Sequence, residues 1–215
     1  MCGRYRASAS AGDVEKLWKV PASEAAEHAL ERIEVKPTTQ IAVVTSDEGP
    51  RMQAVRWGLK PSWMKTSRPL INARADKLAS SGMWKRMASN ANKRCLVVAD
   101  GYYEWLRSES RDTRPQPFLH LVNDGAVFAM AGLLDVAMLD DETVPAATIV
   151  TTEAAGAAAR VHTRMPVILP DHERQDAWLR DDLTLEDVVE LCAPWADQLT
   201  AEPTELPSSA GRNSA

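Results

Sequence analysis

The middle of the sequence alternates short β-rich runs with residues that favour turns. The runs are rich in branched and aromatic side chains and are too short for helices, and Asp47-Glu48-Gly49-Pro50 and Asn123-Asp124-Gly125 are turn signals between neighbouring runs. This arrangement predicts antiparallel strands joined by tight connections. We expect strands at residues 41–45, 52–57, 96–99, 102–106, 118–122, 127–133, 147–151 and 167–169.

Helical patterns lie towards the two ends of the chain. Ser10 and Asp13 have the spacing of a capping box, and so do Thr184 and Asp187. We expect one short helix after Ser10 and further helices at residues 153–160, 171–179 and 185–191. Strands in the middle with helices at the ends predict an α+β fold, with a curved, mostly antiparallel sheet that forms a barrel-like core and with flanking helices.

The sequence indicates one domain. Its 215 residues fall within the size of a single domain, and residues 1–200 contain no internal repeat and no low-complexity linker. Residues 207–215 are rich in Ser, Ala and Gly, so we expect a domain over residues 1–200 and a disordered tail over residues 201–215. The polar stretch at residues 107–116 is expected to be an exposed loop.

Composition and charge argue against several classes of protein. No apolar run approaches the ~20 residues that a membrane-spanning helix needs, and the first residues lack the apolar segment of a secretory signal, so we expect a cytoplasmic protein without membrane contact. The cysteines and histidines show no disulfide or metal-binding spacing, which predicts reduced thiols, no metal ion and no cofactor. A net charge of −5 argues against a general coat for nucleic acid. We expect a monomer.

Cys2 directly follows the initiator methionine. Cysteine is small enough for Met1 to be removed during synthesis, and Cys2 would then carry both a thiol and a free α-amine. Their ordinary pKa values are ~8.5 and ~8, so a usable share of each is deprotonated near neutral pH. A 1,2-aminothiol traps aldehydes, because the amine forms an imine and the adjacent thiol closes a five-membered thiazolidine ring. No internal cysteine can form this ring.

Three further polar residues are candidates for chemistry, although each has an ordinary structural explanation. Asn72 would by default be a turn or cap residue, and His162 a hydrogen-bonded structural histidine. Glu104 is more informative because it lies in an expected strand among bulky apolar neighbours, where a carboxylate is uncommon unless it is paired or functional. Taken alone, Cys2 would also be ordinary, since chain termini tolerate many residues.

Several short motifs contain these candidates. They are Met1-Cys2-Gly3-Arg4-Tyr5, Arg56-Trp57-Gly58-Leu59 followed by Pro61-Ser62-Trp63, Asn72-Ala73-Arg74-Ala75, Arg94-Cys95-Leu96, Ala99-Asp100-Gly101-Tyr102-Tyr103-Glu104-Trp105, Ala131-Gly132-Leu133 and His162-Thr163-Arg164-Met165-Pro166-Val167. In order and spacing they resemble the SRAP (SOS response-associated peptidase) family from Cys2 to about Leu169. A set of motifs in the right order over ~170 residues is far more specific than any one of them.

The resemblance implies a sensor of abasic sites in single-stranded DNA, which forms a thiazolidine crosslink through Cys2 and shields the lesion from strand breakage. It implies Cys2 as the nucleophile and Asn72, Glu104 and His162 as its catalytic companions. An abasic deoxyribose is mostly a closed hemiacetal, so opening its ring needs one proton delivered and another removed, which suits a carboxylate and an imidazole. Glu104 would shuttle the amine and imine protons, His162 would serve the sugar oxygen, and Asn72 would orient the amine or the sugar.

Three arginines lie within two residues of these positions. Arg4, Arg74 and Arg164 are expected to bind the phosphates that flank the lesion, which would bring the protein to the nucleoid. An ion pair with Asp or Glu is the alternative for each of them. Three tryptophans are expected to pack in the core rather than to stack on bases: Trp57, Trp63 and Trp84.

Two other functions stay open. The Cys2 thiol with Glu104 and His162 is compatible with a cysteine-dependent peptidase or an autoprotease that removes the chain's own leader. A non-covalent binder of damaged or modified DNA is the third hypothesis, and it predicts an affinity that fades with salt and leaves no adduct after denaturation. A heat-stable protein–DNA band that requires Cys2 would separate crosslinking from both.

Overall fold

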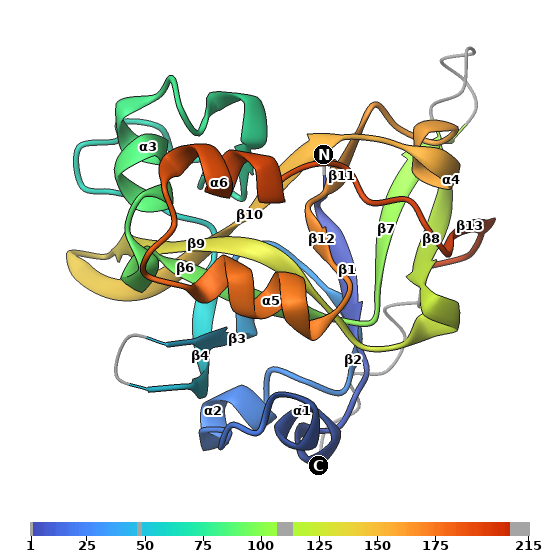
Figure 1. Ribbon diagram of the computed structural model, residues 1–215, viewed down its shortest axis with the longest axis horizontal. Coiled ribbons are helices and arrows are strands. Elements are labelled where there is room, and N and C mark those ends of the chain that lie inside the picture. The colour runs from blue at the N-terminus through green and yellow to red at the C-terminus, as the bar shows by residue number, and fades with distance from the viewer. Residues whose placement is uncertain (1, 47–48, 107–113, 207–215) are drawn as a thin grey trace.

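The computed structural model describes residues 2–46, 49–106 and 114–206, which form two β-sheets with short helices around them (Figure 1). The strands are β1 (Arg4–Ala7), β2 (Arg32–Val35), β3 (Gln40–Thr45), β4 (Arg51–Trp57), β5 (Asn72–Arg74), β6 (Arg94–Ala99), β7 (Gly101–Leu106), β8 (Gln116–Val122), β9 (Phe128–Leu139), β10 (Glu142–Glu153), β11 (Arg164–Pro166), β12 (Ile168–Leu169) and β13 (Leu199–Pro203). The α-helices are α1 (Ala11–Trp18), α2 (Glu24–Glu27), α3 (Gly82–Ala88), α4 (Gly156–Ala159), α5 (His172–Leu179) and α6 (Leu185–Leu191).

One sheet closes into a five-stranded barrel. β10, β4, β3, β6 and β9 are neighbours in that order, and β9 pairs again with β10. Every pairing in this ring is antiparallel except that of β4 with β10. β5, β11 and β12 join the ring at β10 and β9. The expected curved, mostly antiparallel sheet with a barrel-like core is therefore confirmed.

The close approach of β6 and β9 depends on a glycine. Gly132 pairs with Cys95, and a Cβ atom at Gly132 would lie only 2.6 Å from Cys95 Sγ. On the other side of β6, the Trp178 indole of α5 donates a hydrogen bond to the Cys95 carbonyl (3.1 Å), and every residue of β6 is buried. The wall of the barrel is thus closely packed on both sides, which leaves no room for a side chain at position 132.

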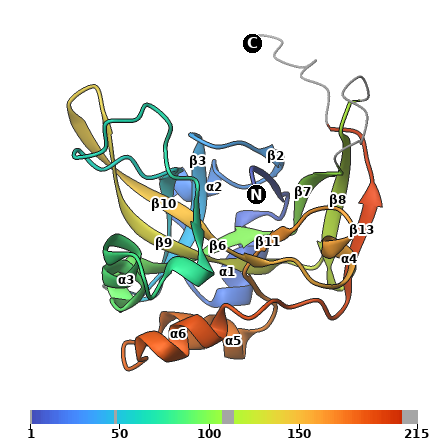
Figure 2. The same cartoon turned by 90° about the horizontal axis from the view of Figure 1, so that it is seen from above.

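The second sheet lies beside the barrel in the order β13, β8, β7, β1 and β2, with antiparallel pairings throughout. The chain crosses from barrel strand β6 to sheet strand β7 at Asp100. This buried carboxylate accepts hydrogen bonds from Arg6 Nε (2.7 Å) and from the backbone N–H of Ser8 (2.8 Å), so the end of β1 is held at the crossover. Figure 2 shows the start of β1 between the barrel and β7.

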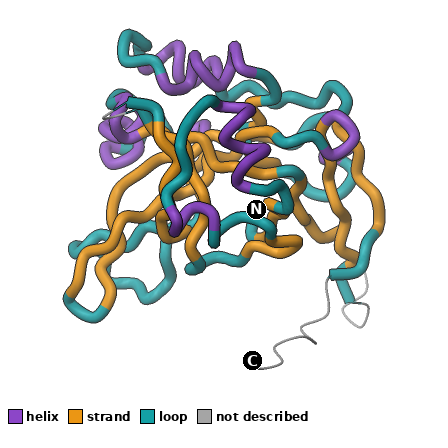
Figure 3. The backbone as a smooth tube through the Cα atoms, turned by 90° about the horizontal axis from the view of Figure 1, so that it is seen from below, coloured by secondary structure: helices purple, strands orange, loops and turns teal. Residues whose placement is uncertain are grey.

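Short helices lie around the strands (Figure 3). The expected helices α1, α5 and α6 are confirmed, and each begins at a side-chain cap: Ser10, Asp171 and Thr184 accept a hydrogen bond from the backbone N–H three residues later. None of the helices within the described ranges is both long enough and apolar enough to cross a membrane.

The helix expected over residues 153–160 is present but shorter. β10 continues to Glu153, and α4 begins only at Gly156 and has four residues. Glu153 pairs with Arg164 of β11, so the first expected residue of the helix belongs to the sheet.

The hairpin of β9 and β10 is longer than the strands expected at residues 127–133 and 147–151. Both strands have twelve residues. The turn between them contains Asp140 and Asp141, with φ angles of 45° and 67°. Two consecutive positive φ angles match the twist of a tight hairpin, and aspartate tolerates this conformation.

The expected domain boundary at residue 200 falls inside β13. Ala201 pairs with His120, and Pro203 pairs with Phe118, so residues 201–203 belong to the second sheet instead of a disordered tail. Pairing with β8 satisfies backbone groups that composition alone assigned to the tail. Residues 107–113 of the expected loop and residues 207–215 of the expected tail lie outside the described residues.

Arg94 is a buried arginine that ties two helices to the barrel. Its Nε donates a hydrogen bond to the Trp178 carbonyl (2.7 Å), its Nη1 to the Ala88 carbonyl (2.6 Å) and its Nη2 to the Arg180 carbonyl. These carbonyls lie at the C-terminal ends of α3 and α5, where a cation is favourable because the carbonyl groups there lack intrahelical partners.

We expect Arg94→Met to lower the free energy of unfolding by about 3–5 kcal/mol, because it leaves three buried carbonyls without their charged donor. Urea unfolding followed by circular dichroism measures this loss. Arg180→Met is the control, since its exposed ion pair with Asp182 contributes less than about 1 kcal/mol. Equal losses for the two variants would contradict the role of Arg94.

Candidate active site

Cys2 lies just before β1 and is completely buried. Arg4 pairs with Tyr103, so the residues ahead of Arg4 run towards Glu104 on the antiparallel strand β7. Burial raises the pKa of the Cys2 thiol far above its usual range, and the negative charge of Glu104 raises it further. The ordinary thiol pKa used in the sequence analysis therefore does not describe Cys2 in this buried position.

Asn72 holds the start of the chain. Its Nδ2 donates a hydrogen bond to the Cys2 carbonyl (2.9 Å), so two expected site residues that lie far apart in the sequence are in direct contact. Asn72 is placed by the parallel pairing of β5 with β10, in which it lies opposite Ile149. Its Oδ1 is buried and accepts no hydrogen bond from the described residues, which leaves an acceptor directed into the site.

Glu104 and His162 approach this site from β7 and from the connection between α4 and β11. Glu104 is 4% exposed, and Leu106 lies on the same face of β7 because residues two apart on a strand point to the same side. A pocket of about 260 Å³ is lined by Leu106 together with Val161, His162 and Thr163. His162 is therefore next to the end of the strand face that carries Glu104.

Arg164 orients the ring of His162. His162 Nδ1 lies 3.0 Å from the backbone nitrogen of Arg164 and 3.2 Å from the Arg164 carbonyl oxygen, so it accepts from the N–H in one tautomer and donates to the carbonyl in the other. Both contacts are to one residue, which fixes the position of the imidazole beside the pocket.

Arg74 and Arg164 lie beside His162 and share one carboxylate. Arg74 Nη2 lies 2.8 Å from Asp76 Oδ2, and Arg164 Nη1 lies 3.4 Å from Asp76 Oδ1. The side chain of Arg74 is 56% exposed, whereas that of Arg164 is 13% exposed and also donates to Thr151 Oγ1 (3.2 Å). These residues lie around a pocket of about 480 Å³, whose lining is Arg74, Glu153, Ala154, Ala159, His162, Thr163 and Arg164.

Arg4 has a similar arrangement on the other side of the site. Its guanidinium forms an ion pair with Glu34, and Lys36 Nζ lies 3.0 Å from the second oxygen of the same carboxylate. The ion-pair alternative considered for the three arginines is thus present at each of them. In both clusters two cations share one carboxylate. This leaves a surplus of positive charge at Arg4 and Lys36, whereas Glu153 lies in the pocket of Arg74 and Arg164 and balances the charge there.

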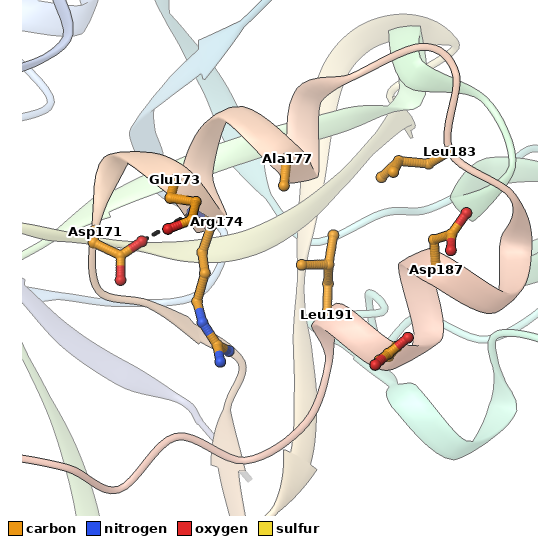
Figure 4. Close-up of a pocket in the computed structure, with 8 residues that line it drawn as sticks. Asp171, Glu173, Arg174, Ala177, Leu183, Asp187 and Leu191 are labelled. Carbon is orange, nitrogen blue, oxygen red and sulfur yellow. Dashed lines mark hydrogen bonds between the residues drawn. The ribbon is translucent and has the colours of Figure 1, made fainter.

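A separate hollow of about 490 Å³ lies between α5 and α6 (Figure 4). Two of its four carboxylates cap helices, since Asp171 accepts from the backbone N–H of Arg174 and Asp187 accepts from that of Thr184. None of the four expected catalytic residues lines it. Neither there nor elsewhere in the described part of the chain do three His, Cys, Asp or Glu side chains group closely enough to hold a metal ion.

Comparison with known proteins assigns the chain to a family. Residues 1–205 match the family model described as SOS response associated peptidase (SRAP). The chain belongs to the SRAP family. The resemblance seen in the sequence motifs is thereby confirmed.

Relatives of this SRAP chain extend over its whole length. The Bacillus subtilis (strain 168) abasic site processing protein YoaM is 31% identical, and the alignment covers 100% of this chain and 96% of YoaM. The Saccharomyces cerevisiae abasic site processing protein YMR114C is 30% identical over 99% of this chain, which spans 65% of the yeast protein. A crystal structure of a Bacteroides thetaiotaomicron protein has a TM-score of 0.81 at 25% identity and covers 95% of this chain and 92% of that one.

The structure of this SRAP chain departs from the sequence analysis at Trp63 and adds one residue to it, His120. Trp57 is buried and Trp84 packs against the core, as expected, but Trp63 is 64% exposed, so the expectation that it packs in the core is wrong. The position of Trp63 in a loop between Pro61 and Lys65 is the sequence signal that could have indicated its exposure. The sequence analysis also missed His120, because the residues that surround it become neighbours only through the pairing of β8 with β7.

His120 is a buried histidine beside the site. Its ring stacks on Tyr102, with centroids 4.3 Å apart and an interplanar angle of 9°. Burial lowers the pKa of His120 to about 4. The ring is therefore neutral at neutral pH, and protonation opposes folding.

We expect His120 to make this protein less stable in mild acid. The unfolded histidine titrates near pH 6.5, so the unfolded chain binds the extra proton between about pH 6.5 and pH 4 and stability falls by about 3 kcal/mol across that window. His120→Phe keeps the stacked ring and should lose this part of the pH dependence in urea unfolding. His172→Gln, at an exposed position, should keep it; identical pH profiles for His120→Phe and the parent would contradict the assignment.

Proposed function

We propose that this protein captures abasic sites in single-stranded DNA as a thiazolidine adduct of Cys2, after removal of Met1. The observation that carries the proposal is the placement of Cys2, which is buried, hydrogen-bonded through its carbonyl to Asn72 and within electrostatic reach of Glu104. The names of YoaM and YMR114C, both abasic site processing proteins, support the same substrate.

The protonation state of Cys2 fits this chemistry. The amine attacks the open-chain aldehyde at C1′, and loss of water leaves an imine. The thiol then adds to the imine carbon, so that a carbon–sulfur bond forms while the S–H proton passes to the imine nitrogen. A thiol that stays protonated in its buried site supplies both the sulfur and that proton, and Glu104 is the nearby group that relays it.

Asn72 and His162 have complementary parts in this reaction. The buried Oδ1 of Asn72 can accept a hydrogen bond from the liberated amine of Cys2, whose carbonyl its Nδ2 already holds. His162, whose ring is oriented by Arg164, delivers a proton to the sugar ring oxygen as the hemiacetal opens.

The arginine clusters supply the affinity for DNA. Arg74 is the most exposed of the three arginines, so phosphates that flank the lesion can reach its guanidinium and can compete with the carboxylates that pair with Arg4 and Arg164. The exposed indole of Trp63 offers a surface on which an unpaired base can stack.

The peptidase hypothesis is less favoured by the same geometry. A cysteine peptidase attacks as the thiolate, whereas burial and the charge of Glu104 both oppose ionisation of Cys2. A non-covalent DNA binder would have no need of a buried Cys2, because phosphate contacts alone would supply its affinity.

We expect the mature protein to give a heat-stable band with single-stranded DNA that bears one abasic site. Cys2→Ala should give none, and neither should a variant with an extra residue ahead of Cys2, because each lacks one half of the aminothiol. Cys2→Ser keeps the amine and should form only a labile imine with some strand cleavage. Denaturing gels and an intact-mass measurement of Met1 removal follow these outcomes.

Cys192→Ala is the control for these variants, since Cys192 is a buried thiol at the end of α6 and should leave crosslinking unchanged. Durable crosslinking by Cys2→Ser would refute the ring-closure step. Full reactivity of protein that retains Met1 would refute the role of the α-amine.

Glu104→Gln should slow adduct formation by about 100-fold, because it removes a proton relay while keeping the shape of the side chain. Affinity should be unchanged for DNA that carries a tetrahydrofuran analogue, which has no aldehyde. Single-turnover crosslinking and fluorescence anisotropy measure the two quantities. Glu142→Gln makes the same change of charge at an exposed residue at the start of β10 and should react normally. A loss of affinity equal to the loss of rate would contradict the acid–base role.

A further inference from the structure

Tyr102 is a buried tyrosine that no step of the proposed reaction uses. Its side chain lies on the same face of β7 as that of Glu104, two residues away. The residue is completely buried, and its hydroxyl forms no hydrogen bond with residues 2–46, 49–106 or 114–206. A buried hydroxyl without a partner destabilises a folded protein, so its presence requires an explanation.

The ring of Tyr102 is held between two neighbours in the sheet. His120 of β8 stacks on it at 4.3 Å, and Tyr5 of β1 lies directly opposite it on the other side. Tyr5 is itself fixed by an edge contact with Trp57 of the barrel, with centroids 5.3 Å apart. The Tyr102 ring therefore has little freedom to turn away from the face that it shares with Glu104.

The reacting groups lie within electrostatic reach of this hydroxyl. Burial raises the pKa of Tyr102 well above its ordinary value, and negative charge on Cys2 and on Glu104 raises it further. The phenol therefore stays neutral and keeps its proton, which makes it a hydrogen-bond donor next to the position where the aldehyde must react.

We propose that the Tyr102 hydroxyl donates a hydrogen bond to the C1′ oxygen of the open-chain sugar while the Cys2 amine attacks C1′. This inference rests on the proposed function and adds the group that stabilises charge on the oxygen. As the nitrogen–carbon bond forms, the carbonyl electron pair moves onto the oxygen. The oxygen then takes up a proton lost by the amine, and it departs as water after a second proton is delivered. A fixed donor at a developing oxyanion lowers the barrier most in a site that excludes water.

Tyr103 provides a matched control on the same strand. It points to the opposite face of β7, where its hydroxyl donates a hydrogen bond to the Ile33 carbonyl (2.8 Å). Tyr103→Phe therefore breaks an existing hydrogen bond, whereas Tyr102→Phe breaks none within the described part of the chain. The same chemical change at adjacent residues should therefore act on different quantities. Tyr102→Phe should lower the reaction rate, whereas Tyr103→Phe should lower the stability.

The experiment compares Tyr102→Phe and Tyr103→Phe in the full-length mature chain. Tyr102→Phe should slow single-turnover crosslinking by roughly 100-fold. Its affinity for DNA with the tetrahydrofuran analogue should be unchanged, and its thermal midpoint should equal or exceed that of the parent. Tyr103→Phe should crosslink at the parent rate and should lower the thermal midpoint by about 2–4 °C.

Crosslinking by Tyr102→Phe at the parent rate overturns the inference. A lower thermal midpoint for Tyr102→Phe also overturns it, because the hydroxyl would then have a structural partner, and so does a loss of affinity equal to the loss of rate. A parent protein that forms no heat-stable adduct refutes the proposed function itself. A reactive parent with an equally reactive Tyr102→Phe refutes only the role of Tyr102.

Discussion

The hydrogen bond from Asn72 Nδ2 to the Cys2 carbonyl connects the start of the chain to the barrel, and the geometry of the site depends on it. A chain terminus is normally among the most mobile parts of a protein. Here the residues on both sides of β1 are tied down, because Asp100 binds Arg6 and Ser8 at its other end. β1 is thereby a rigid strand with a reactive residue at its tip, which suits a reaction that depends on the position of one amine and one thiol.

Burial of the site has two consequences that follow from the same physical cause. Removal of water raises the pKa of the Cys2 thiol, and it also leaves Asn72 Oδ1 and the Tyr102 hydroxyl without hydrogen-bond partners among the described residues. These buried polar atoms lower the stability of the free protein. In the proposed reaction they are groups that the sugar aldehyde engages, as is typical of sites in which stability is lost in favour of function.

Elements with strong local signals were predicted well, and elements that depend on distant partners were not. The caps at Ser10, Asp171 and Thr184 begin helices because their side chains bind backbone groups only three residues away. β5 and β11 have three residues each and exist only because β10 pairs with them, so no periodic pattern marks them. Pairing with β11 also extends β10 to Glu153, the first residue of an expected helix.

The sequence by itself determined the family, the barrel-like class of fold and the four residues proposed for chemistry, since ordered motifs and local patterns are properties of the chain alone. The tertiary structure decided what surrounds those residues. It buried Cys2, gave each arginine a carboxylate partner, exposed Trp63 and brought His120 and Tyr102 beside Glu104. Desolvation and electrostatic reach depend on distances between strands that are far apart in sequence, and only the folded packing determines those distances.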